Sequence, residues 1–314
     1  MRELLLQGKF NDDDKKKIQA IVQDYELVED IASLKNPSEL EIVLGWSPDL
    51  TDFIQNEPHK IKYIQTTSAG VNSLPLQLLA EKGIQLANAS GVHGGPIAES
   101  VFGFLLGHIR KLPEIGAQQK DKIWQRYSPM DELRGKTVML VGTGSIGQHI
   151  ATLAKAFSAH TIGVSRRGRD VENIDRVYKQ SEIHAHIADA DIVISSLPET
   201  PSTNDIFDRE LFNAMKPGTI FINVGRGNAV VEEDLVEALD SGQVGQAFLD
   251  VFKVEPLPET SPLWEREDVF ISPHTTARRK DYNSHVIEIF TENFRSLQET
   301  GEISTNVADY ESGY

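Results

Sequence analysis

The chain has 314 residues, of which 39% are hydrophobic and 25% are charged, a composition typical of a globular protein with about two domains. Its formal net charge of −16 at pH 7 argues against a nucleic-acid partner, because an acidic surface repels phosphate backbones. No apolar run approaches the ~20 residues that a membrane-spanning helix needs.

Cysteine is absent from the sequence, which excludes disulfides, thiolate nucleophiles and cysteine-bound zinc. The histidines form no HExxH or similar ligand cluster, so we expect no metal site. The apolar stretch that follows Met1 is too short for a signal peptide, and we expect a cytoplasmic protein.

Short apolar strands alternate with helical stretches in the N-terminal part of the chain, and we expect strands at 4–6, 41–44, 61–65 and 84–87. Asn11 is expected to cap a helix whose first turn holds Asp12, Asp13 and Asp14, since carboxylates favour the positive end of a helix dipole. This alternation implies a parallel sheet covered on both faces.

A long apolar stretch at 97–115 predicts one continuous helix, and 124–133 is expected to be irregular. A second strand–helix series begins at Lys136, with strands expected at 137–141, 160–164, 192–195, 219–223, 246–249 and 269–271. A last helix at 280–300 is too short for a domain and is expected to pack on the N-terminal unit. The predicted fold class is α/β, with two Rossmann-like, doubly wound parallel-sheet domains, one of them discontinuous, and an interdomain cleft.

A glycine loop follows the strand at 137–141 and opens a helix, with the sequence Gly142-Thr143-Gly144-Ser145-Ile146-Gly147. Gly142 permits a tight turn, Gly144 lets the backbone approach a pyrophosphate, and Gly147 lets the helix pack close to the sheet. The helix N-terminus adds N–H donors and the positive end of a dipole. A glycine-rich turn without a ligand is the alternative, which the strand–helix frame disfavours. We therefore predict a dinucleotide site.

The next strand ends at Ser165, followed by Arg166 and Arg167. About twenty residues after the glycine loop, an NAD-binding protein usually carries an acid that binds the ribose 2′-hydroxyl. A carboxylate would repel a 2′-phosphate, whereas serine donates a hydrogen bond and arginine suits phosphate. The sequence favours NADP(H) over NAD(H). The alternative is that both arginines are solvated loop charges.

Polar residues follow three later strands, at the edge where open α/β sheets bind ligands. Arg226 lies between two glycines, Asp250 and Glu255 follow the next strand, and His274 follows the last. Histidine exchanges protons near neutral pH, a neighbouring carboxylate favours the imidazolium, and arginine offers paired donors to a carboxylate or keto acid. Taken singly, each has another explanation: a strand-end cap, a solvated acid, a surface charge. Together they predict reduction of a 2-keto acid.

In these residues and their spacing, the chain resembles the D-isomer-specific 2-hydroxyacid dehydrogenase family over nearly its whole length. The stretches that carry the resemblance are Gln65–Asn72, Asn88–Glu99, the glycine loop, Asn223–Gly227, Leu249–Pro256 and Ser272–His274. The resemblance implies that His274 protonates the carbonyl oxygen, Glu255 holds His274 protonated and oriented, and Arg226 grips the substrate.

The resemblance also implies two sets of binding residues. Asp250 would hold the nicotinamide amide, and the amides of Ser68, Ala69 and Gly70 would bind the substrate carboxylate. The expected cofactor-binding residues are Gly142, Thr143, Gly144, Ser145, Ile146, Gly147, Ser165, Arg166, Arg167, Leu197, Pro198, Val224, Gly225, Arg226, Asp250 and His274. The expected substrate-binding residues are Trp46, Ser68, Ala69, Gly70, Arg226 and His274. Trp46 stands at a strand end, where a core position is the alternative.

By the same resemblance, residues 1–98 with 277–314 form a substrate domain, and residues 99–276 form a dinucleotide-binding domain inserted into it. The family usually forms a homodimer built on its cofactor domains. Phosphoglycerate dehydrogenases of the family often add a C-terminal regulatory domain, and we expect none after the last helix of this sequence.

Three positions depart from the family pattern. Asn72 stands where aspartate is frequent, and Thr275 and Thr276 follow His274 where small and aromatic residues are common. The Ser165 segment resembles the NADPH-linked glyoxylate and hydroxypyruvate reductase branch. An alternative function of another class is a nucleotide-sensing, corepressor-like binding protein without turnover, since transcriptional corepressors resemble this fold too.

Overall fold

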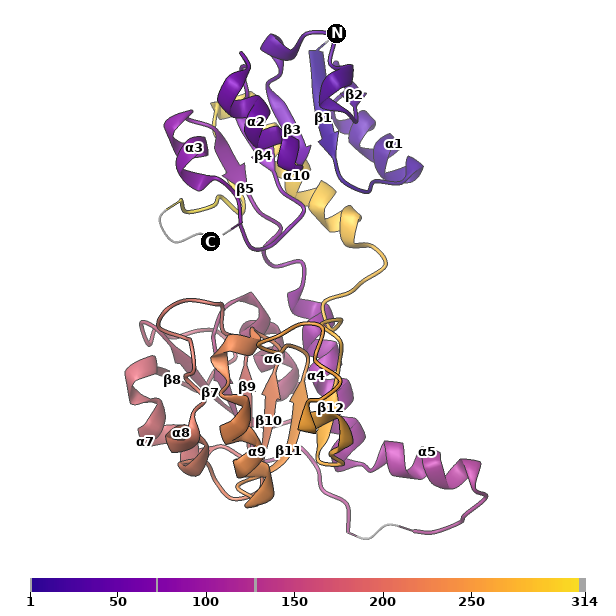
Figure 1. Ribbon diagram of the computed structural model, residues 1–314, viewed down its shortest axis with the longest axis vertical. Coiled ribbons are helices and arrows are strands. Elements are labelled where there is room, and N and C mark those ends of the chain that lie inside the picture. Colours follow the sequence, from indigo (N-terminus) through magenta and orange to yellow (C-terminus); the bar gives the residue numbers. More distant parts are fainter. Residues whose placement is uncertain (1, 72, 127–128, 311–314) are drawn as a thin grey trace. The chain divides into compact units, whose positions relative to one another are not determined.

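The computed structural model describes residues 2–71, 73–126 and 129–310. The chain separates into two compact units, here called the N-terminal unit (Met1–Val92 with Arg279–Tyr314) and the central unit (His93–Arg278). The boundaries expected after residues 98 and 276 lie a few residues away from these divisions. Each unit is an α/β layer structure with its own parallel sheet (Figure 1).

The N-terminal unit has a five-stranded parallel sheet in the order β2-β1-β3-β4-β5. Its strands are β1 (Arg2–Gln7), β2 (Tyr25–Val28), β3 (Ile42–Gly45), β4 (Tyr63–Gln65) and β5 (Gln85–Ala87). Its helices are α1 (Asp12–Ile21), α2 (Pro48–Asn56), α3 (Leu76–Glu81) and α10 (Tyr282–Thr300). This strand order is that of flavodoxin-like doubly wound folds.

Both faces of this sheet are covered, which is why its strands are apolar runs rather than alternating patterns. One face packs on α1 and α10, where Phe290 of α10 stacks on Tyr63 with ring centroids 6.0 Å apart. The helix start predicted at Asn11 is confirmed, because the Asn11 side chain accepts hydrogen bonds from the amides of Asp13 and Asp14 at 2.9 Å.

The central unit has a seven-stranded parallel sheet in the order β12-β11-β10-β9-β6-β7-β8. Its strands are β6 (Thr137–Val141), β7 (His160–Ser165), β8 (Arg176–Lys179), β9 (Ile192–Ser195), β10 (Thr219–Asn223), β11 (Val244–Leu249) and β12 (Val269–Ile271). The order reverses between β6 and β9, and doubly wound sheets bind ligands beyond the strand ends at such a switch point.

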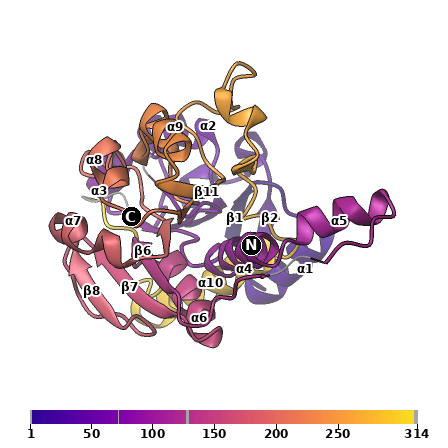
Figure 2. The ribbon, with the colours of Figure 1, turned by 90° about the horizontal axis from the view of Figure 1, so that it is seen from below.

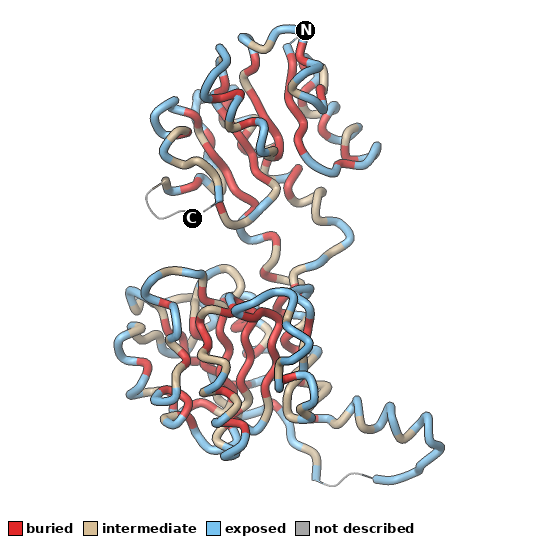
Figure 3. The backbone as a smooth tube through the Cα atoms, viewed as in Figure 1, coloured by how far each residue is buried: buried red, intermediate tan, exposed pale blue. Residues whose placement is uncertain are grey.

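Helices cover both faces of the central sheet, and its strands are buried between two apolar clusters (Figure 3). The helices of the central unit are α4 (Gly94–Ile109), α5 (Leu112–Lys120), α6 (Ser145–Ala156), α7 (Ile183–His186), α8 (Arg209–Asn213) and α9 (Glu232–Asp240). No helix in the described part of the chain has both the length and the hydropathy that a bilayer crossing requires.

The single helix predicted at 97–115 is wrong, because the structure breaks it into α4 and α5. The chain turns at Lys111, which has a left-handed φ of 55°, and Pro113 follows in the first turn of α5, where its missing N–H costs nothing. α5 then extends away from the sheet of its own unit as an arm (Figure 2).

Two strands, β2 and β8, were not predicted. Both are short edge strands at one side of their sheet, and β8 has exposed ends at Arg176 and Lys179. An edge strand has only one neighbouring strand and needs fewer apolar residues, so its sequence lacks a buried-strand pattern.

Candidate active site

The predicted site residues gather at the carboxyl edge of the central sheet. The parallel register aligns the last residues of five neighbouring strands in one row, namely Val141, Ser195, Asn223, Leu249 and Ile271. The loops that leave this row contain the glycine loop, Arg226, Glu255 and His274. The topology therefore brings together residues that lie far apart in the sequence.

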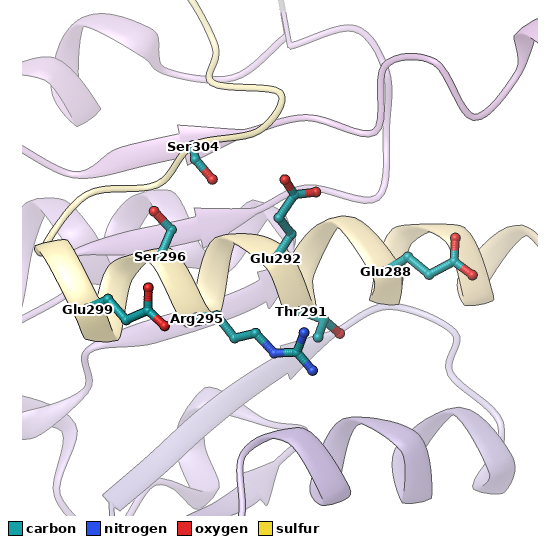
Figure 4. Close-up of a pocket in the computed structure, with 7 residues that line it drawn as sticks. All are labelled: Glu288, Thr291, Glu292, Arg295, Ser296, Glu299 and Ser304. Atoms are coloured by element: carbon teal, nitrogen blue, oxygen red, sulfur yellow. The ribbon is translucent and has the colours of Figure 1, made fainter.

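A depression of about 670 Å³ lies on α10 of the N-terminal unit (Figure 4). It is lined by Glu288, Thr291, Glu292, Arg295, Ser296, Glu299 and Ser304. These side chains belong mostly to one helix and have no glycine loop or histidine among them. We therefore place the candidate site at the strand ends of the central unit.

Each glycine of the loop after β6 has a distinct structural task. Gly142 has a φ of 108°, and a Cβ there would lie 2.8 Å from the Ser196 hydroxyl. A Cβ on Gly147 would lie 2.2 Å from the carbonyl oxygen of Gly142, so only glycine lets α6 pack this closely. A Cβ on Gly144 would meet nothing within 4 Å, which leaves open space in front of the loop.

The N-terminus of α6 is free to bind a ligand. Gly144 precedes the helix without a side-chain cap, and the first bond within the helix runs from the Gln148 amide to the Gly144 carbonyl. Within the described part of the chain, the amides of Ser145 and Ile146 therefore remain as donors at the positive end of the helix dipole. This geometry fits the diphosphate of a dinucleotide.

The neighbouring loops approach the glycine loop and one another closely. A Cβ on Gly225 would lie 2.6 Å from the carbonyl oxygen of Leu197, and one on Gly227 would lie 1.9 Å from the carbonyl carbon of Phe252. The loop after β10 is thus wedged between the Leu197–Pro198 segment and the loop after β11. Leu197 and Val224 are buried at this junction.

His274 and Glu255 form a hydrogen-bonded pair at this edge. The Nδ1 atom of His274 lies 2.8 Å from the Oε2 atom of Glu255, and the other carboxylate oxygen accepts the Phe252 amide at 3.0 Å. The His274 side chain keeps 48% of its exposure, so the imidazole is accessible to a ligand. A fixed carboxylate on Nδ1 sets the tautomer that leaves Nε2 for proton exchange.

Arg226 is exposed, and its guanidinium Nη1 donates to the Gly225 carbonyl at 2.8 Å. Its backbone is held by Asn223, a fully buried side chain at the end of β10. The Asn223 amide donates to the Arg226 carbonyl at 3.0 Å, and its oxygen accepts the Gly225 amide at 3.2 Å. Among the described residues, no carboxylate pairs with Arg226, so the guanidinium is available for an anionic ligand.

The loop after β7 carries the predicted phosphate-binding residues. The Ser165 hydroxyl accepts the Gly168 amide at 3.1 Å, which leaves its proton to donate outward. Arg166 and Arg167 are exposed, and no ion pair within the described chain engages either guanidinium. The strand register places Ser165 opposite Lys179, which adds another cation at this end of the sheet.

Comparison with known proteins decides the family. The model of the D-isomer specific 2-hydroxyacid dehydrogenase NAD-binding domain matches residues 102–276, more than half of the chain. The chain belongs to the D-isomer specific 2-hydroxyacid dehydrogenase family. It is therefore an oxidoreductase with an NAD(P)-binding Rossmann domain, as its central sheet order also indicates.

Relatives of this dehydrogenase cover most of its length. The glyoxylate reductase/hydroxypyruvate reductase of Mus musculus is 35% identical over 219 residues, 68% of this chain and 67% of that protein. A family protein from Aeromonas salmonicida has 35% identity and a TM-score of 0.81, covering 98% of this chain and 99% of that one. The NADPH-dependent glyoxylate/hydroxypyruvate reductase from Sinorhizobium meliloti, solved with NADP and sulfate, has 27% identity and a TM-score of 0.78 and covers 100% of both chains.

In the N-terminal unit of the dehydrogenase, Trp46 and the Ser68–Gly70 loop follow the neighbouring parallel strands β3 and β4. Trp46 is half-buried against the core cluster of its unit. The Ser68 hydroxyl donates to the Gly70 carbonyl at 2.9 Å, and within the described residues the amides of Ala69 and Gly70 donate to no protein acceptor. Asn72 lies outside the described residues.

Three residues of the dehydrogenase site had no role in the sequence analysis. Asn223 supports the Arg226 loop, and the hydroxyls of Ser272 and Thr276 donate to the Asp250 carboxylate at 2.6 and 2.5 Å. Asn223 and Ser272 have a signal in the sequence, a polar residue directly at the end of an apolar strand, whereas Thr276 lies further along the loop after β12. Among the described residues, no group of three or more histidine, aspartate or glutamate side chains is arranged to hold a metal ion.

Proposed function

We propose that this dehydrogenase reduces small 2-keto acids to D-2-hydroxy acids with NADPH, and that His274 donates the proton to the carbonyl oxygen. The observation that carries the proposal is the 2.8 Å contact between Nδ1 of His274 and Oε2 of Glu255 on an exposed imidazole. The carboxylate holds Nδ1, which leaves Nε2 for the proton that reduction consumes.

A bound nicotinamide supplies a hydride to the carbonyl carbon, and the protein supplies the rest. His274 gives its Nε2 proton to the carbonyl oxygen, so the product gains one hydride and one proton. Glu255 holds the ring, and the paired donors of Arg226 bind the keto acid. The unbonded amides of Ala69 and Gly70, with the Ser68 loop, are the proposed ligands for the substrate carboxylate, with Trp46 as a further proposed substrate contact.

The residues of the central unit fit the proposed cofactor. The glycine loop has open space at Gly144 and free amides at Ser145 and Ile146 for the diphosphate. The outward hydroxyl of Ser165 and the guanidinium groups of Arg166 and Arg167 suit a 2′-phosphate, and no acid stands at Ser165 to bind a ribose hydroxyl. Structural neighbours with NADP bound support NADP(H) over NAD(H). Thr143, Leu197, Pro198, Val224, Gly225 and Asp250 complete the proposed cofactor site.

The test is a spectrophotometric assay of NADPH oxidation by the purified protein with glyoxylate, hydroxypyruvate, pyruvate and phenylpyruvate, followed by chiral analysis of the product. We expect oxidation with at least one keto acid, a D-configured product and a higher kcat/KM for NADPH than for NADH. NADPH binding without oxidation of any of the four would instead indicate the corepressor-like sensor.

We further propose a homodimer built on the central unit. The α5 arm and the segment after it expose Leu112, Ile123 and Trp124, with Trp124 94% exposed. The same unit has an apolar groove of about 930 Å³, whose walls include Phe104, Phe248 and Phe270. In a two-fold dimer each copy contributes one arm and one groove. A single interface would then bury the exposed apolar residues of the arms and of the grooves.

A further inference from the structure

The backbone of His274 adopts a conformation that L-residues rarely take. Its φ is 49°, in the left-handed region, where the Cβ of a residue other than glycine crowds the following carbonyl. His274 is flanked by Pro273 and Thr275, both exposed, so packing of its neighbours does not impose the conformation. Hydrogen bonds must hold it.

Most of those bonds come from one buried residue, Asp250. The His274 amide donates to the Asp250 carbonyl at 2.9 Å and also to the Ser272 carbonyl at 3.0 Å. The Asp250 carboxylate accepts the Ser272 hydroxyl at 2.6 Å, the Thr275 amide at 2.9 Å, the Thr276 amide at 3.3 Å and the Thr276 hydroxyl at 2.5 Å. These donors lie on both sides of His274 in the chain.

The network is buried and well supplied with donors. Asp250 is 2% exposed, Ser272 7% and Thr276 6%. A carboxylate offers about four lone-pair positions, and the Ser272 hydroxyl, the Thr275 amide and both Thr276 donors share them. If the buried carboxylate lost one donor, its charge would be incompletely hydrogen-bonded. Other arrangements of the segment are therefore less stable than this one.

Asp250 is in turn fixed to the sheet. It directly follows β11, and its amide donates to the Asn223 carbonyl at 3.0 Å, at the end of the neighbouring strand β10. The imidazole therefore has two fixed points. Its backbone is held by Asp250, and its Nδ1 is held by Glu255, which is itself anchored to the Phe252 amide.

From this arrangement we infer that Thr276, through its hydroxyl bond to Asp250, is a positioning residue that holds His274 in the left-handed conformation from which its imidazole meets Glu255. Ser272 acts in the same way from the other side of His274. The inference rests on the proposed function only in assigning the proton transfer to His274. It gives Asp250 a role in the His274 segment in addition to its expected role at the nicotinamide amide. Because a change at Asp250 would disturb both roles, Thr276 provides the cleaner test.

The central variant is Thr276→Val, which keeps the shape of the side chain and removes the donor. Thr276→Ser keeps the donor and serves as the conservative variant. Thr161→Val is the matched control, because Thr161 is a fully buried threonine of the same unit whose hydroxyl also reaches an aspartate, Asp175, at 3.3 Å. Thr161 lies near the start of β7, at the opposite edge of the sheet from His274.

We expect Thr276→Val to lower kcat roughly 10- to 100-fold, as displaced catalytic groups do, while the KM and the dissociation constant for NADPH change less than about threefold. Thr276→Ser should restore most of kcat. Thr161→Val should lower the melting temperature to a similar extent and leave kcat unchanged. Ser272→Ala should act in the direction of Thr276→Val, and it replaces that variant if Thr276→Val does not fold.

A readout independent of turnover is the ¹⁵N NMR spectrum of the histidine rings. In the parent protein the His274 Nδ1 signal should report one fixed, hydrogen-bonded tautomer, and in Thr276→Val this signal should shift toward that of a mobile imidazole. If the parent protein reduces no keto acid, the proposed function fails, and the NMR experiment still decides the positioning. Unchanged ring signals and kcat in Thr276→Val, or equal losses of kcat in Thr161→Val, would overturn the inference.

Discussion

Glu255 contacts His274 with one carboxylate oxygen while its other oxygen is bound to the protein backbone. The Oε2 atom lies 2.8 Å from Nδ1 of the imidazole, and Oε1 accepts the Phe252 amide at 3.0 Å. The acid is therefore a fixed partner rather than a solvated loop charge, although 36% of its side chain is exposed. The first two predictions depend on this contact.

Glu255→Gln should lower kcat for keto-acid reduction by roughly 10-fold or more. The amide oxygen of glutamine can still accept the Phe252 amide, so the loop keeps its shape, but the carboxylate that lies on Nδ1 of His274 and sets the tautomer of the ring is lost. The measurement is kcat of the parent and of the variant with the same keto acid, and an unchanged kcat would remove Glu255 from the mechanism.

His274→Ala should abolish measurable turnover and leave NADPH binding nearly intact. General acid catalysis contributes about 10²- to 10⁴-fold, and the imidazole lies beyond the end of β12, apart from the glycine loop that is proposed to bind the diphosphate. Single-turnover kinetics would measure the first effect, and fluorescence titration with NADPH the second. A variant that retains a tenth or more of the parent kcat would exclude His274 as the proton donor.

Charge reversal at Arg166 and Arg167 should act on NADPH and spare NADH. Each guanidinium that binds a phosphate contributes about 1.5–3 kcal/mol, so the double variant Arg166→Glu with Arg167→Glu should raise the KM for NADPH at least ~10-fold. Arg176→Glu is the control, since Arg176 is exposed and stands at the start of β8, away from the strand end that pairs with Ser165. Equal effects on both nucleotides would mean that the two arginines are ordinary surface charges.

Two glycines of one loop should respond in opposite ways to alanine. Gly144→Ala places a methyl group in space that the protein leaves open, at a φ of −73° that any residue adopts, so the cost in stability is about 1 kcal/mol or less. The methyl group would stand where the diphosphate approaches, and NADPH binding should weaken at least ~10-fold. Gly147→Ala forces a Cβ to within 2.2 Å of the Gly142 carbonyl and should destabilise the fold by about 1–3 kcal/mol. Thermal unfolding and nucleotide titration of both variants separate the two effects.

The sequence predicted those features of the structure for which a residue type has a single physical explanation. The fold class, the family and the His274–Glu255 pair could be predicted from the three glycines of the loop and the charged residues at strand ends. Sequence reasoning did not reveal the break at Lys111, although Pro113 marks it, since a proline inside an apolar helical pattern ends or kinks the helix before it. It also missed Thr276, whose partner Asp250 lies 26 residues away and becomes its neighbour only when β11 and β12 pair.

The apolar groove of the central unit gives the last prediction. Phe270 lies on the edge strand β12, is 52% exposed and lines the groove with Phe104 and Phe248. Burial lowers the pKa of His108, another residue of the groove, so this side chain is uncharged at neutral pH and compatible with an apolar partner. If a second copy covers the groove, Phe270→Lys places a charge in a desolvated interface and should weaken the dimer by a factor of at least ~10.

The matched control is Val307→Lys, since Val307 is also 52% exposed but belongs to the N-terminal unit. Sedimentation velocity over a range of protein concentrations would measure the dissociation constant of each variant. Acidification should act in the same direction as Phe270→Lys, because protonating His108 introduces a charge into the groove below the lowered pKa, whereas Val307→Lys should leave the dimer unchanged. A monomeric parent protein, or equal weakening by the two lysine variants, would show that this groove is not the subunit interface.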